Sequence, residues 1–230
     1  MPRWLWLPLF ILTFVPCAAR PDDSGVPEGF KPLFNGKDLS GWKVREAGDP
    51  KVWGAEKGLI YVNGKGGDWL MTEKEYSDFE LQLEFKLPNA GNSGVALRCG
   101  LKGNPHSEAG MEIQLLDDPW YLDQKNYKGL KPTQKTGSIY GVVPPSKDAL
   151  KPVGEWNQMH ITAKGPRIIV VLNGEKIVDA DLRDHKDKLK EAKGMMNPKG
   201  HLGMQSHEGG SKGHEGRVEF RRLYIKELTK

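Results

Sequence analysis

Polar and apolar side chains alternate along the segment 111–115, where Glu112 and Gln114 separate Met, Ile and Leu. Successive side chains of a β-strand point to opposite faces, so this acid and this amide share the face away from the core. The same alternation in 93–98 turns Arg98 outward. A carboxylate can remove a proton, and a guanidinium can stabilise the negative charge that then develops.

Two further polar side chains, Gln205 and His207, share one face of a later strand. Outward polar residues on an antiparallel sheet are usually only a solvated face. Here they are acid, amide, guanidinium and imidazole groups rather than the Lys, Thr and Ser of an ordinary surface. This composition leaves a solvated face and a functional face both open, and on a functional face Glu112, His207 and Arg98 are the candidate catalytic residues.

Composition and charge exclude several classes of protein. The 230 residues contain 34 Lys and Arg against 30 Asp and Glu, and the resulting net charge of +4 is spread along the chain. This distribution argues against nucleic acid or an acidic membrane as partner. Cys17 and Cys99 cannot form a disulfide framework, and no Cys/His spacing typical of a zinc site occurs.

The N-terminal residues are typical of a secretory signal, because a basic start precedes a mostly apolar run at 4–15 and small residues follow. The run is too short to span a membrane. We therefore expect residues 1–19 to be removed on export to the periplasm or the cell exterior. An uncleaved anchor is the alternative, and Pro16 argues against lipidation of Cys17.

Period-2 alternation dominates from residue 52 onward and predicts strands with one buried face. The clearest stretches are 59–62, 79–87, 93–98, 111–115, 156–161, 168–172, 175–178 and 218–225. Asn173-Gly174 predicts a two-residue hairpin turn. A short helix is expected only in 182–193, where the apolar stripe is thin.

Many short antiparallel strands without βαβ alternation indicate an all-β sandwich or barrel. No linker is visible, so we expect residues 20–29 to be a short N-terminal lead and residues 30–230 to form one domain. Three tryptophans in turn-to-strand contexts are expected in the core: Trp42, Trp53 and Trp156.

Several short segments occur in an order that identifies a family: 34–42 (FNGKDLSGW), 93–98 (SGVALR), 112–117 (EIQLLD), 136–141 (TGSIYG), 155–157 (EWN), 203–207 (GMQSH) and 218–221 (VEFR). The chain resembles, from about residue 30 to residue 228, the family long called DUF1080. Its members are now described as 3-keto-disaccharide hydrolases, or 3-keto-glucoside 1,2-lyases and 3-keto-2-hydroxy-glucal hydratases.

The resemblance implies a concanavalin A-like (laminin-G-like) jelly roll, with a sugar on the concave face of two curved sheets. It also implies export, alongside a sugar 3-dehydrogenase that makes the keto sugar. The chain departs from the family in two places. Arg222 stands where the family usually has Asn, and the loop 208–216 is enlarged.

The chemistry that the resemblance implies starts from a glucoside oxidised at C3, whose ketone acidifies the C2 hydrogen. We expect Glu112 or His207 to remove that hydrogen while the other assists the leaving oxygen. Arg98 or a divalent ion would stabilise the enolate. The C1 substituent is expelled, and addition of water to the resulting 3-keto-2-hydroxy-glucal completes net hydrolysis.

Substrate contacts are expected from the family motifs and from nearby amides and aromatic groups: Gln114, Gln205, Tyr140, Asp117 and Trp120. An aromatic face suits the apolar side of a sugar, so Trp69 and Tyr121 are further stacking candidates. A divalent ion is a candidate cofactor, with Glu112 and His207 as ligands. The dipeptides His207-Glu208 and His214-Glu215 bracket a Gly-rich loop that is either an ion site or a hairpin tip.

Two other functions stay open. Glu112 and Asp117 outline the acidic motif of retaining glycosidases, whose two carboxylates lie about 5 Å apart. Strict alternation, however, puts these two residues on opposite faces unless a β-bulge intervenes. The fold also serves lectins, so a non-catalytic carbohydrate-binding module is the second alternative.

Overall fold

The computed structural model describes residues 25–45, 48–63, 66, 68–123, 125, 127–207 and 216–229, whose strands form two antiparallel sheets. Sheet A contains β1 (Lys31–Pro32), β3 (Trp53–Glu56), β4 (Leu59–Val62), β6 (Phe79–Lys86), β9 (Asn157–Lys164), β10 (Arg167–Leu172), β11 (Glu175–Asp181) and β13 (Val218–Glu227). Sheet B contains β2 (Trp42–Val44), β5 (Trp69–Tyr76), β7 (Asn92–Cys99), β8 (Met111–Leu116) and β12 (Gly200–Gln205).

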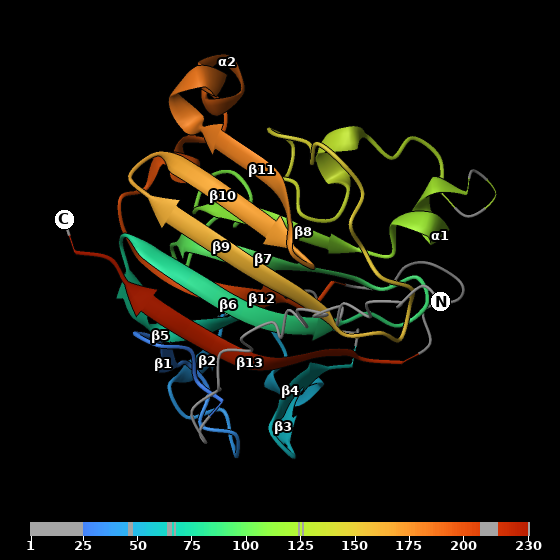
Figure 1. The fold of residues 1–230 in the computed structure, drawn as a ribbon, viewed down its shortest axis with the longest axis vertical. Helices are drawn as coiled ribbons and strands as arrows, with labels where there is room; N and C mark the ends of the chain where they lie inside the picture. Colours follow the sequence, from blue (N-terminus) through green and yellow to red (C-terminus); the bar gives the residue numbers. More distant parts are fainter. Residues whose placement is uncertain are drawn as a thin grey trace, which may run out of the picture.

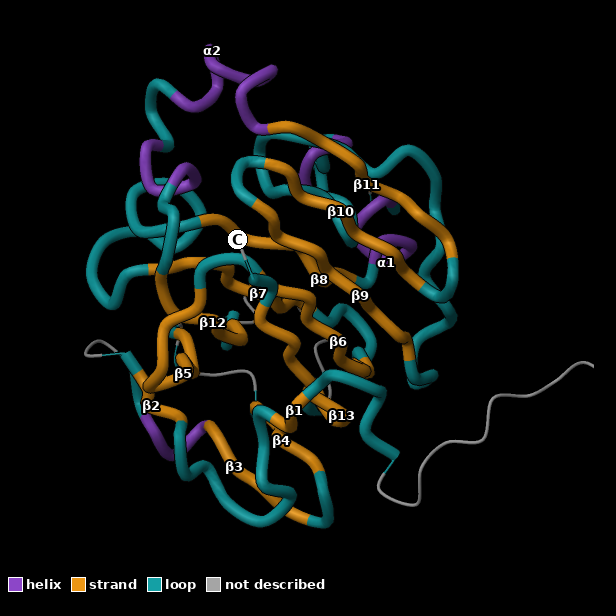
Figure 2. Tube along the Cα trace, turned by 60° about the vertical axis from the view of Figure 1, so that its left-hand side comes forward, coloured by secondary structure: helices purple, strands orange, loops and turns teal. Residues whose placement is uncertain are grey.

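The order of strands is β11-β10-β9-β6-β13-β4-β3 in sheet A, with β1 paired to β13, and β2-β5-β12-β7-β8 in sheet B. Figure 1 looks through sheet A onto sheet B behind it. In both views β3 and β4 lie at the end of the molecule opposite α2 (Lys186–Leu189) (Figure 2). The other α-helix, α1 (Asp118–Leu122), follows β8 directly.

The main hydrophobic core lies between the sheets. Sheet A contributes Leu81, Leu83, Phe85, Met159 and Ile161, and sheet B contributes Leu70, Val95, Leu97, Ile113 and Met204. The residues that alternate with these face outward, as the period-2 pattern predicts. The expected all-β sandwich is therefore confirmed.

The predicted strands agree with the structure to within a few residues at either end. The Asn173-Gly174 turn between β10 and β11 has φ values of +51° and +86°, as a two-residue hairpin of this kind requires. Trp42 and Trp53 are buried, whereas Trp156 was wrongly expected in the core. It is half-buried, and the Arg221 guanidinium lies 4.0 Å from its ring centroid.

The helix expected in 182–193 is broken into short pieces, namely η3 (Leu182–His185), α2 and, beyond it, η4 (Lys193–Met196). The thin apolar stripe buries only Leu182 and Leu189 in the first two. The remaining 3-10 turns are η1 (Pro50–Val52) and η2 (Pro132–Gln134). No helix among the described residues is long and apolar enough to cross a membrane.

Candidate active site

The outer face of sheet B brings together most of the polar residues singled out in the sequence. Gly203 pairs with Met71 on one side and Ala96 on the other, and Ala96 pairs with Glu112. In the neighbouring rows Trp69 pairs with Gln205, and Gly94 pairs with Gln114. The acid and both amides therefore project from the same face.

Small residues in the middle strands make room for the larger side chains beside them. A Cβ added to Gly94 would lie 2.0 Å from Oε1 of Glu112. One added to Gly203 would lie 2.3 Å from the sulfur of Met71. Because real Cβ atoms do not approach so closely, the carboxyl of Glu112 requires glycine at position 94.

Glu112 is 2% exposed, which is unusual for an acid. Burial raises the pKa of this carboxyl, and the nearby His106 and His207 offset only part of the rise. A carboxyl whose pKa is raised is a stronger base than an ordinary carboxylate and, once protonated, can return the proton. Glu112 therefore has the property of a general base or acid.

His106 is the residue at this site that sequence reasoning missed. Its Nδ1 lies 3.5 Å from Oε2 of Glu112, and its side chain is 36% exposed. The ring lies 5.1 Å from that of Tyr140, centroid to centroid. The residue belongs to the loop between β7 and β8, which has no periodicity to mark it, and only its place beside Glu112 shows its role.

Arg45 fixes the loop that carries His106. Its Nε donates to the carbonyl of Leu101 at 3.0 Å, and its Nη2 donates to that of Gly103 at 2.5 Å. The Asn197 amide donates to the carbonyl of Ala109 at 2.8 Å near the end of the same loop. These bonds hold the imidazole in place without a strand beneath it.

Tyr140 is held against β8 as the motif 136–141 forms an additional edge of sheet B. The N–H of Tyr140 donates to the carbonyl of Glu112 at 3.0 Å, and that of Gly137 donates to the carbonyl of Gln114 at 2.8 Å. The amide of Gln134 donates to the Tyr140 hydroxyl at 2.9 Å. Since the hydroxyl accepts this bond, its own hydrogen is available to a ligand.

Gln205 presents an acceptor without a partner. Its Oε1 is buried and forms no hydrogen bond within the described ranges. A buried acceptor left unpaired is costly, and such atoms commonly mark a place for water or a ligand. Gln114, in contrast, is 5% exposed, and its Oε1 accepts from the N–H of Leu115.

His207 follows the end of β12 and is exposed, and its charge acts on the Glu112 carboxyl. The enlarged loop is described only at Gly216, so Glu208, His214 and Glu215 lie outside the described residues. Among the residues that are described, no three His, Cys, Asp or Glu side chains are grouped as a metal site would require.

Arg98 does not join this site, and the expectation that it lies beside Glu112 is wrong. A β-bulge opposite Leu202 shifts the register of β7, and Arg98 adopts a φ of +49°. Its guanidinium bonds instead to the carbonyls of Ser77 and Gly165 and to the Asp78 carboxylate, at 2.6, 2.6 and 2.9 Å. A bulge breaks the alternation on which the expectation rested.

Asp117, expected to contact substrate, is 2% exposed and bonds to the backbone. Its two carboxylate oxygens accept from the N–H groups of Ala90 and Trp120, at 2.9 and 3.4 Å, and it caps α1. Trp120 is half-buried on that helix, edge-on to the buried Tyr121 at 4.8 Å. Trp69 is also buried, packed with Met71 and Ala96.

Comparison with known families gives one match over almost the whole described chain. A family model described as a 3-keto-alpha-glucoside-1,2-lyase-like domain matches residues 29–226. A 3-keto-disaccharide hydrolase of Bacteroides thetaiotaomicron is 28% identical, over 92% of this chain and 83% of that protein.

Solved structures share the fold. A structure from Parabacteroides distasonis, described as a glycosyl hydrolase, has a TM-score of 0.73 and 30% identity, covering 87% of this chain and 95% of that one. A carbohydrate-binding module, CBM66 of Bacillus subtilis, has a TM-score of 0.51 at 12% identity, covering 81% of this chain and 96% of the module. The second likeness concerns the fold alone.

Proposed function

Because the chain belongs to the 3-keto-alpha-glucoside-1,2-lyase-like domain family, we propose that it is a carbohydrate enzyme that cleaves 3-keto-glycosides. The observation that carries the proposal is the buried Glu112 carboxyl, whose Oε2 lies 3.5 Å from Nδ1 of His106 on the outer face of sheet B. The relative from Bacteroides thetaiotaomicron, called a 3-keto-disaccharide hydrolase, supports the same substrate class.

The first step is an elimination. Glu112 takes the proton from C2, which the neighbouring ketone has acidified, and the C2–H electron pair forms an enolate. The enolate then expels the substituent at C1 by breaking the C1–O bond. His207 gives a proton to the leaving oxygen, and the product is a 3-keto-2-hydroxy-glucal.

The enolate oxygen needs a hydrogen-bond donor, and Arg98 does not lie at the site to supply one. In this proposal the hydroxyl of Tyr140 does so, because it accepts from Gln134 and keeps its own hydrogen free. Gln205 contributes its unpaired side-chain carbonyl as an acceptor for a sugar hydroxyl.

The second step is a hydration. Water adds its hydroxyl to C1 of the glucal and gives its other proton to His207, which lost one in the first step, and Glu112 returns its proton to C2. The sum of the two steps is hydrolysis of the glycosidic bond, with the ketone unchanged. The substrate must be made by an oxidation at C3, so a sugar 3-dehydrogenase is the expected supplier.

The test incubates the purified protein with a 3-keto-disaccharide and follows released sugar together with the ultraviolet band of the enone-like glucal. Turnover supports the proposal. Loss of turnover with a chelator would add a divalent ion to it. No turnover, with saturable binding of the unoxidised disaccharide, would overturn it in favour of a lectin-like module.

A Glu112→Gln variant tests the base directly. We expect kcat to fall by about 10²–10⁴-fold, the usual contribution of a general base. Its Tm at neutral pH should not fall, because a neutral amide replaces a carboxyl that is costly to ionise in a buried site. Full activity of this variant would remove Glu112 from the mechanism.

Export to the periplasm or the cell exterior belongs to the same proposal, and it rests on residues 1–19, which lie outside the described residues. N-terminal sequencing of the protein from its native cell fraction tests it. Cleavage after Ala19 supports export by a secretory signal, and an intact N-terminus in the cytoplasm contradicts it.

A further inference from the structure

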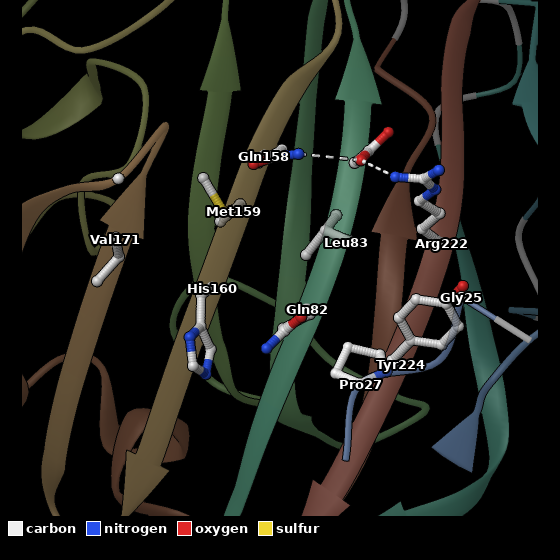
Figure 3. A pocket seen from close by; sticks show the side chains of 12 residues that line it. Gly25, Pro27, Gln82, Leu83, Gln158, Met159, His160, Val171, Arg222 and Tyr224 are labelled. Atoms are coloured by element: carbon white, nitrogen blue, oxygen red, sulfur yellow. Dashed lines mark hydrogen bonds and ion pairs between the residues drawn. The ribbon is translucent and has the colours of Figure 1, made fainter. Parts of the chain in front are cut away.

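The outer face of sheet A carries a pocket that the proposed reaction does not use (Figure 3). Its volume is about 300 Å³, and it is lined mainly by β6, β9 and β13, with Gly25 and Pro27 at one side. Because these side chains alternate with core residues of sheet A, the pocket and Glu112 lie on opposite faces of the sandwich.

One row of side chains crosses the pocket. His160 pairs with Gln82, and Gln82 pairs with Tyr224. Figure 3 shows the Gln82 amide between the His160 ring and the Tyr224 ring. Gln82 is half-buried, and its side chain forms no hydrogen bond to any residue that the structure describes. Its donor and acceptor are therefore both available.

A second row surrounds a buried carboxylate. Glu84, 5% exposed, accepts from Arg221 Nε at 2.6 Å, from Arg222 Nη1 at 3.1 Å and from the Gln158 amide at 3.3 Å. Burial alone would raise the pKa of Glu84, but these bonds, that of Arg221 first, outweigh it and the pKa is lowered. The carboxylate is thus charged at neutral pH.

Arg222 is held there in a strained backbone conformation. A β-bulge between Arg221 and Tyr224 turns Arg222 toward Glu84 at a φ of +51°, which favours Gly or Asn. Since Arg221 already pairs with Glu84 at the shorter distance, charge balance alone does not require Arg222. Its side chain is 61% exposed, with further N–H donors beside the pocket.

We propose that this pocket binds one pyranose unit of a saccharide, separately from the reaction at Glu112. Neighbouring sugar hydroxyls both donate and accept, which matches the Gln82 and Gln158 amides and the Glu84–Arg222 pair. The Tyr224 ring suits the apolar side of the sugar. The volume suits a single ring.

The test is a titration of the isotope-labelled protein with methyl β-D-glucopyranoside, followed by amide chemical shifts. We expect saturable shifts in β6, β9 and β13 with a Kd in the millimolar range, typical of a ligand with about 13 non-hydrogen atoms. No saturation, or shifts confined to residues around Glu112, would overturn the proposal.

Two variants separate recognition from folding. Gln82→Leu and Arg222→Asn should each weaken binding about tenfold or more, by removing hydrogen bonds to the sugar. Arg222→Asn should keep its Tm, because Asn tolerates the positive φ. Thr162→Val, on the same face of β9 but outside the pocket, is the matched control and should bind normally. Unchanged affinity in both pocket variants would contradict the site, whatever the activity toward keto-glycosides.

Discussion

The protonation of Glu112 depends on two opposing influences that single residues supply. Burial among the strands of sheet B raises its pKa, whereas His106 and His207 lower it. His106 does not need to touch substrate to act, because the proportion of ionised Glu112 at a given pH changes with the neighbouring imidazole. We therefore treat His106 as a positioning residue that favours the ionised form of the base.

Replacing His106 by Gln tests this role. Without the imidazole the pKa of Glu112 rises further, so the base form requires a higher pH. The acidic limb of the kcat/KM profile should shift upward, with the largest loss at low pH and recovery at high pH. His185→Gln, in η3, is the control. An equal loss at every pH would contradict the role and make His106 the base.

Sequence alternation located Glu112, Gln114 and Gln205 correctly, because regular strands fix which face each side chain takes. It failed at two residues for distinct physical reasons. Arg98 sits at a bulge, where the alternation is broken. His106 sits in a loop that tertiary bonds to Arg45 hold, and no local pattern records such bonds.

At the scale of elements, two adjacent acids, Asp117 and Asp118, hold α1 in place by different hydrogen bonds. Asp117 caps the helix, while Asp118 accepts from the N–H of Thr136 at 3.0 and 3.1 Å. Asp118 thus ties the helix that carries Trp120 to the motif that carries Tyr140. Burial raises the pKa of Asp118 from 3.8 to about 6.

Asp118→Asn should stabilise this connection above pH 6. The protonated acid is favoured in the fold, so its contribution to stability is present below pH 3.8 and is lost as pH rises through about 6. Asn stays neutral and still accepts from Thr136. The free energy of unfolding should rise by up to about 3 kcal/mol at pH 7.5, and the gain should shrink toward pH 4. A loss of stability at pH 7.5, measured by denaturant titration, would contradict this account.

Strand β5 is one that the sequence did not predict, because it lacks alternation. In β5 the first four residues are buried in succession, because Trp69 and Met71 pack in a second apolar cluster on the outer face while Leu70 faces the core. A strand buried on both faces loses its period-2 pattern. Strands β6, β9 and β10 keep a more solvated outer face, and their patterns located them.

At the scale of the molecule, Arg98 links sheet B to two turns beside sheet A by hydrogen bonds, in addition to the apolar contacts of the core. It belongs to β7 of sheet B, and its guanidinium reaches the turn between β5 and β6 and the turn between β9 and β10. Asp78 completes the connection by accepting also from the N–H of Gly165 at 3.0 Å. The arginine is 3% exposed, so it stabilises the packing of the sheets rather than meeting solvent or substrate.

Arg98→Ala should therefore destabilise the fold while leaving the chemistry of each folded molecule intact. Removing the buried guanidinium leaves its hydrogen-bond partners unpaired and lowers the free energy of unfolding by about 3 kcal/mol or more. A change of this size lowers the Tm of a chain of this length by roughly 6–12 °C. Arg98→Gly separates side chain from backbone: glycine accepts the φ of +49° and should be about 1 kcal/mol less destabilised than Ala. Calorimetry and turnover well below the Tm check both. An unchanged Tm with lost turnover would return Arg98 to the reaction, against the geometry that separates it from Glu112.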